Sequence, residues 1–175
     1  MLILEGCDLA GKTTFAHRLI KELNKRFGRV RFYSYASLTR PTAAWSQYWT
    51  YAKRIYNEIV QDRFHMSYSI YRNMVPNNKQ PEHLEHQYAN VEKALAKVGA
   101  LTVVLCPSDT LVEHRYGAHA EELLSLPDVL TVNASYHATK LPHDLKLFSG
   151  ADCNWPGEFE LEKVIHEYAK RQKLS

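Results

Sequence analysis

The amino-acid sequence predicts one α/β domain, a three-layer sandwich in which helices cover both faces of a five-stranded parallel sheet. Short apolar runs alternate along the chain with helical patterns of ten or more residues, which is the order typical of a parallel sheet. The chain has 175 residues, enough for one domain with a real core. No repeat, linker or low-complexity tract divides it, so we expect a single domain over residues 1–175.

The strands are predicted where short runs are rich in apolar or β-favouring residues. These runs lie at residues 2–4, 29–35, 58–62, 101–106 and 145–149. The pattern is strongest in "LTVVLC" at 101–106, which Pro107 ends. Ligands of such sheets bind beyond the carboxyl ends of the strands. We therefore expect a functional rim after Glu5, Tyr35, Asp62 and Cys106.

The helices are predicted where apolar residues recur at helical spacing. These segments cover residues 13–27, 42–56, 64–74, 82–98 and 158–172. Gly28 and Gly99 are expected to end two of them, because glycine readily adopts the left-handed conformation that closes a helix. The region 109–143 has a weaker pattern, and we expect two short helices there, broken at Pro127, that form a lid.

Charge and cysteine content narrow the class of function. The chain has 22 Lys and Arg against 19 Asp and Glu, a net charge of +3 that suits an anionic ligand but does not by itself indicate nucleic acid. No apolar run approaches the roughly 18 residues of a membrane span, and Glu5 and Asp8 interrupt the N-terminal run, so no signal peptide is expected. The three cysteines, Cys7, Cys106 and Cys153, form no disulfide framework or zinc motif. These features favour a cytoplasmic protein.

A phosphate-binding motif follows the first predicted strand directly. Residues 6–13, "GCDLAGKT", match the P-loop (Walker A) pattern G-x-x-x-x-G-K-[ST] in full. Its glycines allow a tight turn whose N–H groups converge on phosphate oxygens, and the next helix adds its positive N-terminal end. Lys12 is expected to reach the β- and γ-phosphates, and Thr13 to ligand Mg²⁺. The predicted nucleotide-binding residues are Gly6, Ala10, Gly11, Lys12, Thr13 and Thr14.

A P-loop alone does not distinguish kinases, GTPases and motors. The chain lacks the guanine-binding signature NKxD and is too short for a motor core. A small kinase that uses ATP and Mg²⁺ is the interpretation that remains.

Two motifs resemble the thymidylate kinase family of P-loop nucleotide kinases. "LEGCDLAGKTT" at 4–14 is similar to its first motif, EG-x-D-x-x-GKTT, and "DRFHMSYSIY" at 62–71 is similar to its DR[YF]-x-x-S segment with a tyrosine nine residues after the aspartate. Residues 38–41 and 101–115 resemble the family more loosely. The sequence departs from it at Arg72, where glutamine is usual, and at Cys106, where a carboxylate is frequent. The resemblance implies the P-loop NTPase fold and transfer of the γ-phosphoryl of ATP to a deoxynucleoside monophosphate, and by analogy a compact kinase of this kind suits a bacteriophage.

The resemblance also implies roles for individual residues. Asp8 would lie near the metal and the sugar or phosphate of the acceptor, and Asp62 would hold Mg²⁺ through water. Arg63 would grip the acceptor phosphate, and Ser67 and Tyr71 would line the acceptor pocket. The residues support this independently, because an Asp-Arg pair at a strand end beside a P-loop supplies one anion for a metal and one cation for a phosphate. A surface ion pair is the alternative.

Three further arginines complete the predicted site. Arg40 and Arg72 are expected to bind the acceptor, with the tryptophans and tyrosines of 45–56 forming a wall for its base; core packing is the alternative for these aromatic residues. Phosphoryl transfer needs a cation where charge develops, and the loop interior, residues 7–10, has none. Arg115 in the lid is therefore the predicted catalytic cation, with Lys140 behind it; a solvated arginine is the alternative for Arg115.

Two other functions stay open at this stage. In the first, the acceptor of the kinase is a hydroxyl, on a nucleoside or on a modified base or end in DNA, with Asp8 or Asp62 as general base. In the second, the chain is a regulatory module that binds nucleotide without turnover. The expected partner is a small-molecule nucleotide, with DNA only under the alternative; no membrane is expected, and a homodimer is left open.

Overall fold

The fold places five parallel strands in the order β2-β3-β1-β4-β5. The structure is a computed structural model that describes residues 1–28, 32–35, 59–71, 84–118, 124–140, 144–149 and 154–174. The strands are β1 (Leu2–Gly6), β2 (Phe32–Tyr35), β3 (Ile59–Asp62), β4 (Leu101–Cys106) and β5 (Asp144–Phe148). The predicted α/β class with a parallel sheet is confirmed. The predicted helix 42–56, Arg40 and Arg72 lie outside the described residues.

Strand β1 lies in the centre of the sheet and is buried along its whole length. It pairs with β3 on one side, where Leu4 is opposite Asp62, and with β4 on the other, where Gly6 is opposite Leu105. Because all three strands run in the same direction, their carboxyl ends meet at one edge of the sheet. The loop after β1 therefore lies between the segments that follow β3 and β4.

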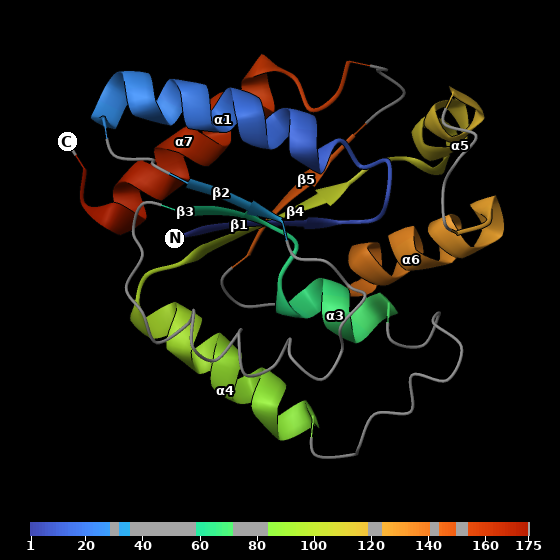
Figure 1. Cartoon of the computed structure of the whole chain (residues 1–175), viewed down its shortest axis with the longest axis horizontal. Helices are drawn as coiled ribbons and strands as arrows, with labels where there is room; N and C mark the ends of the chain where they lie inside the picture. The colour runs from blue at the N-terminus through green and yellow to red at the C-terminus, as the bar shows by residue number, and fades with distance from the viewer. Residues whose placement is uncertain are drawn as a thin grey trace.

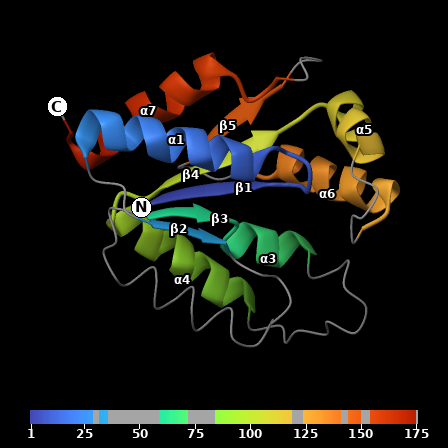
Figure 2. The same cartoon turned by 45° about the horizontal axis from the view of Figure 1, so that its top comes forward.

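Helices cover both faces of this sheet (Figures 1 and 2). On one face, α1 (Lys12–Phe27) packs against α7 (Glu158–Gln172). On the other face lie α3 (His65–Tyr71) and α4 (Leu84–Lys97), and α6 (Leu126–Ala138) packs against α3 and β4. Helix α5 (Asp109–Ala118) follows β4 at the carboxyl edge of the sheet. Among the described residues, no helix is long and apolar enough to span a membrane.

Two predicted helix ends, at Gly28 and Gly99, are found in the structure, and the predicted break at Pro127 is not. Gly28 and Gly99 adopt left-handed conformations (φ 61° and 63°) after α1 and α4, as predicted. The expected break at Pro127 is wrong, because this proline lies in the first turn of α6, after the cap residue Ser125. A first-turn N–H has no partner within its helix, so proline is tolerated there.

Candidate functional site

The loop between β1 and α1 forms a tight cradle. Gly6 and Gly11 have φ values of 148° and 82°, and Leu9 is also left-handed at 65°. A Cβ atom on Gly6 would lie 2.7 Å from the carbonyl oxygen of Leu105 in β4. A side chain at Gly6 would thus push the loop away from the sheet, which explains the glycine there.

Gly6→Ala is expected to lower the free energy of unfolding by about 1–3 kcal/mol or more, because it adds a strained φ and a clash with backbone. Urea denaturation followed by circular dichroism measures this loss. Gly117→Ala in α5 is the matched control, since a Cβ there meets no atom within 4 Å. The control should be neutral or stabilising, and a Gly6→Ala protein as stable as wild type would contradict the cradle geometry.

Lys12 begins α1 and turns back into the cradle. It is only 5% exposed, and its Nζ donates hydrogen bonds to the carbonyl oxygens of Gly6 (3.0 Å) and Cys7 (2.6 Å). The residue before it, Gly11, has no side chain to cap the first turn, and that turn contains no acidic residue. The cradle thus combines one lysine charge with the positive end of a helix, an arrangement suited to phosphate.

Thr13 and Asp62 form a second feature of the cradle. The Thr13 hydroxyl donates to Oδ2 of Asp62 at 2.9 Å, and Asp62 is buried at the carboxyl end of β3. Oxygen donors of this kind fit Mg²⁺, which is usually bound by one or two carboxylates together with substrate phosphates. No group of three or more His, Cys, Asp or Glu side chains in the described ranges could hold a metal ion. A magnesium site here would therefore depend on phosphate oxygens as well.

Asp8, Arg63 and Tyr71 meet on the α3 side of the cradle. Arg63 forms an ion pair with Oδ1 of Asp8, and the Tyr71 hydroxyl donates to Oδ2 of Asp8 at 3.0 Å. The backbone N–H of Asp8 donates to the Tyr71 oxygen at 2.9 Å, and the guanidinium of Arg63 lies 4.9 Å from the centre of the Tyr71 ring. Asp8 of the P-loop is thus in direct contact with two predicted site residues of the distant segment 62–71.

Ser67 occupies a different place from the one predicted. It is fully buried, and its hydroxyl is bonded to the carboxylate of Glu5 and to the Tyr136 hydroxyl (2.7 Å). Burial, followed by the negative charge of Glu5, raises the pKa of Tyr136 well above its usual range, so this hydroxyl stays protonated. Ser67 therefore lies inside the protein rather than on a binding surface, because the first turn of α3 packs onto β1.

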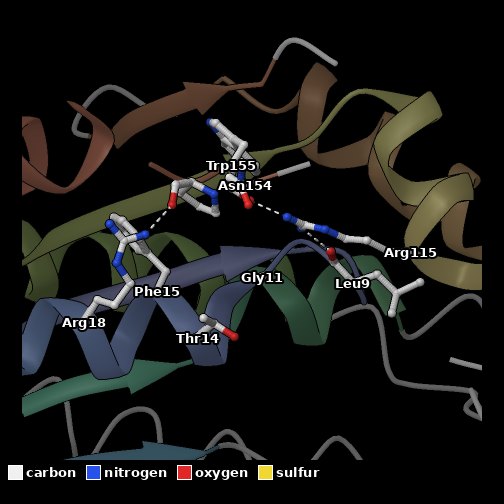
Figure 3. Close-up of a pocket in the computed structure, with 9 residues that line it drawn as sticks. Leu9, Gly11, Thr14, Phe15, Arg18, Arg115, Asn154 and Trp155 are labelled. Carbon is white, nitrogen blue, oxygen red and sulfur yellow. Dashed lines mark hydrogen bonds between the residues drawn. The ribbon is translucent and has the colours of Figure 1, made fainter. Parts of the chain in front are cut away.

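A pocket of about 360 Å³ lies on the other side of the cradle (Figure 3). Arg115, near the end of α5, reaches across it and donates to the carbonyl oxygens of Leu9 (2.8 Å) and Trp155. Arg18 of α1 donates to the Pro156 carbonyl at 2.7 Å. The remaining lining residues are Gly11, Thr14, Phe15 and Asn154. The pocket combines apolar side chains with two guanidinium groups and is large enough for a planar ring.

The other predicted residues lie around this site. Ala10 is fully buried in the loop, whereas Thr14 is exposed and lines the pocket. Lys140 is exposed just beyond the end of α6. Cys7 and Cys106 are free thiols, and burial raises the pKa of each to about 11, which leaves them protonated and unreactive at neutral pH.

Comparison with known proteins identifies the fold. No protein-family model matches the chain, and no curated protein matches it in sequence. A solved structure of the YorR protein from Bacillus subtilis, in complex with phosphorylated GDP, matches with a TM-score of 0.74. The match covers 99% of this chain and 98% of YorR at 18% sequence identity. This chain shares the fold of YorR. At this identity the likeness establishes the fold alone, so the resemblance to thymidylate kinases stays a prediction.

The sequence did not reveal every residue of the site. Glu5 was visible only as the acidic residue of the first motif, and Arg18 as one polar position of an amphipathic helix. Residues 154–156 follow β5 and carried no recognisable pattern. All of these positions become apparent only when segments distant in sequence are brought against the P-loop.

Proposed function

We propose that the protein is a P-loop nucleotide kinase that transfers the γ-phosphoryl group of ATP to a deoxynucleoside monophosphate. The observation that carries this proposal is that the cradle has a cluster of charged and polar side chains on one flank and a pocket on the other. Asp8 of the loop contacts Arg63 and Tyr71, while Leu9 contacts Arg115 beside the pocket. Two nucleotides that exchange a phosphoryl group require this arrangement.

The donor nucleotide would occupy the pocket and the cradle. Its base would lie in the pocket against the guanidinium of Arg115, and its phosphates would enter the cradle, where Lys12 exchanges its carbonyl partners for phosphate oxygens. Mg²⁺ held by Thr13 and, through water, by Asp62 would supply positive charge to the β- and γ-phosphate oxygens.

The acceptor phosphate would bind to Arg63. Its side chain is 7% exposed, and within the described part of the chain its Nε has no hydrogen-bond partner. An oxygen of the acceptor phosphate attacks the γ-phosphorus, the bond from that phosphorus to the bridging oxygen breaks, and ADP leaves. The attacking oxygen is already anionic, so no strong base is needed, and positioning together with charge neutralisation accounts for catalysis.

A hydroxyl acceptor is the alternative, because the Asp8 carboxylate lies in the loop itself, where it could take a proton. Both of its oxygens are already engaged, one by Arg63 and one by Tyr71. A hydroxyl acceptor would have to displace one of these bonds before Asp8 could take its proton. The two bonds favour the monophosphate acceptor over a nucleoside or a DNA end.

Measuring ATP consumption with Mg²⁺ over a panel of acceptors tests the proposal. The panel contains the four deoxynucleoside monophosphates, guanosine monophosphate, free nucleosides and DNA oligomers; the guanine nucleotide is included because YorR was solved with phosphorylated GDP. We expect consumption that depends on a deoxynucleoside monophosphate, thymidylate first. Consumption with nucleosides or DNA alone would support the hydroxyl acceptor, and none with any acceptor would indicate a binding module.

Arg115→Ala is expected to weaken ATP binding about tenfold and to slow single-turnover transfer, because a charge-assisted hydrogen bond is worth about 1.5–3 kcal/mol. Arg115→Lys should restore only part of the ATP affinity and of the single-turnover rate, since an ammonium point charge does not reproduce the planar donors of a guanidinium. Calorimetric titration of ATP and rapid-quench kinetics measure the two effects. Arg26→Ala, at the far end of α1, is the control.

The two measurements separate the possible roles of Arg115. A slower single turnover with unchanged ATP affinity would give it only the transition-state role predicted from the sequence. Wild-type behaviour in both measurements would remove Arg115 from the site.

A further inference from the structure

Glu5 is a buried carboxylate on which five hydrogen bonds converge. It is 0% exposed, at the end of β1 just before the P-loop. Its Oε1 accepts from the N–H groups of Phe64 (2.9 Å) and Met66 (3.1 Å). Its Oε2 accepts from the Ser67 N–H (3.2 Å), the Ser67 hydroxyl and the Tyr136 hydroxyl (3.3 Å). An ionised carboxylate only accepts hydrogen bonds, so it suits a site where every partner donates.

Three of these bonds fix the segment that follows Arg63. The donors follow directly after Arg63: Phe64 precedes α3, and Met66 and Ser67 lie in its first turn. The N–H of Arg63 itself donates to the carbonyl of Leu4 at 2.9 Å. Strand β1 therefore holds the chain at Arg63 and immediately after it. This hold explains how a residue with a β-carbon keeps a left-handed conformation, with φ at 63°.

The same carboxylate connects to α6. The Tyr136 hydroxyl lies 3.3 Å from Oε2 of Glu5 and 2.7 Å from the Ser67 hydroxyl. Asn133, one turn earlier, accepts a hydrogen bond from the Cys7 thiol at 3.5 Å and donates to the Pro107 carbonyl at 2.9 Å. Two polar residues on one face of α6 thus reach the base of the cradle. Glu5 lies where β1, α3 and α6 meet.

We infer that Glu5 is a positioning residue for the acceptor, and this inference rests on the proposed function. Glu5 is too deeply buried to touch a substrate. It seats the first turn of α3 on β1, so that Arg63 meets Asp8 beside the cradle with its guanidinium facing the phosphates. Lys12 and Gly11 are placed by α1 and by the loop itself. Loss of the Glu5 carboxylate should therefore impair use of the acceptor more than binding of the donor.

Glu5→Gln tests this inference with little change in shape. The amide nitrogen of glutamine would face N–H donors, and the charge that strengthens the remaining bonds would be lost. We expect the acceptor KM to rise about tenfold, while the Kd of ATP measured without acceptor changes less than about twofold. Parallel losses in both constants, or wild-type values in both, would overturn the inference.

Ser67→Ala is the matched control, because it removes one hydroxyl from the network and keeps the three backbone bonds to Glu5. It should lower thermal stability but leave the acceptor KM close to that of wild type. An equal rise of KM in both variants would show that general loosening, and not the hold on Arg63, is responsible. If Glu5→Gln does not fold, Glu5→Asp keeps the charge and shortens its reach, and it should raise the acceptor KM without changing ATP affinity.

The outcome can be separated from failure of the proposed function. If the wild-type protein transfers phosphoryl to no acceptor, the proposed function is wrong, and Glu5 is judged by calorimetric titration of thymidine monophosphate. An affinity about tenfold lower in Glu5→Gln, but not in Ser67→Ala, would still support positioning. Equal or unmeasurable affinity in wild type and Glu5→Gln would overturn it.

Discussion

Lys12→Ala is expected to reduce phosphoryl transfer by at least about ten- to a hundredfold, because it removes a charged donor to the β- and γ-phosphates. The fold should persist at some cost in stability, because the buried carbonyls of Gly6 and Cys7 lose one donor each while the rest of the loop keeps its contacts. Steady-state kinetics measure the loss, and far-ultraviolet circular dichroism checks the fold. Lys21→Ala, an exposed position on the same helix, is the control.

Two other results for Lys12→Ala would change the interpretation of the cradle. Wild-type rates in Lys12→Ala, with Lys21→Ala also unchanged, would mean that the cradle does not bind the transferred phosphate. If Lys12→Ala binds ATP more weakly but the wild type shows no acceptor-dependent turnover, the cradle binds nucleotide and the protein is a binding module.

Arg63→Ala is expected to lower kcat/KM for the acceptor about a hundredfold, because a bidentate contact between guanidinium and phosphate combines two charge-assisted bonds. ATP affinity in the absence of acceptor should change little, since Arg63 contacts the α3 flank of the loop rather than the pocket. Acceptor kinetics and ATP titration on the same preparation measure the two effects. Arg63→Lys should restore only part of the rate.

A change in ATP affinity as large as the change in acceptor use would contradict this assignment. Arg63 would then act on the shared cradle through Asp8, whose carboxylate loses its cationic partner in the variant. Asp8→Asn separates the two cases, because it breaks the ion pair and keeps the guanidinium. If Arg63 binds the acceptor itself, Asp8→Asn should retain more acceptor affinity than Arg63→Ala.

The fold was predictable because its signals are local. Strand β4 and helix α7 have the residue ranges that their patterns predicted, and the P-loop follows a strand and begins a helix as its motif requires. The position of Pro127 was misjudged because a proline at the start of a helix and one between helices look alike in sequence. The cap at Ser125 distinguishes the two cases only once its bond to Asp128 is known.

The candidate site was predictable only in part, because its contacts join distant segments. Lys12, Thr13, Asp8 and Arg63 belong to motifs, and motifs made them visible. Ser67 belongs to the same motif as Arg63, yet it faces Glu5 in the interior. A motif does not reveal which side of a short helix is buried. The pocket beside Arg115 depends on residues 154–156, which reach it from beyond β5 and follow no pattern.

The left-handed conformation of Arg63 implies a trade-off within one residue, between a relaxed backbone and the cation that the residue presents. A residue with a β-carbon in this region is destabilised by about 1–2 kcal/mol, and glycine would escape that penalty. Glycine at position 63 would relax the backbone, but it would leave the Asp8 carboxylate without its cationic partner. An arginine at this position marks a place where the chain accepts a less stable backbone in order to present a cation.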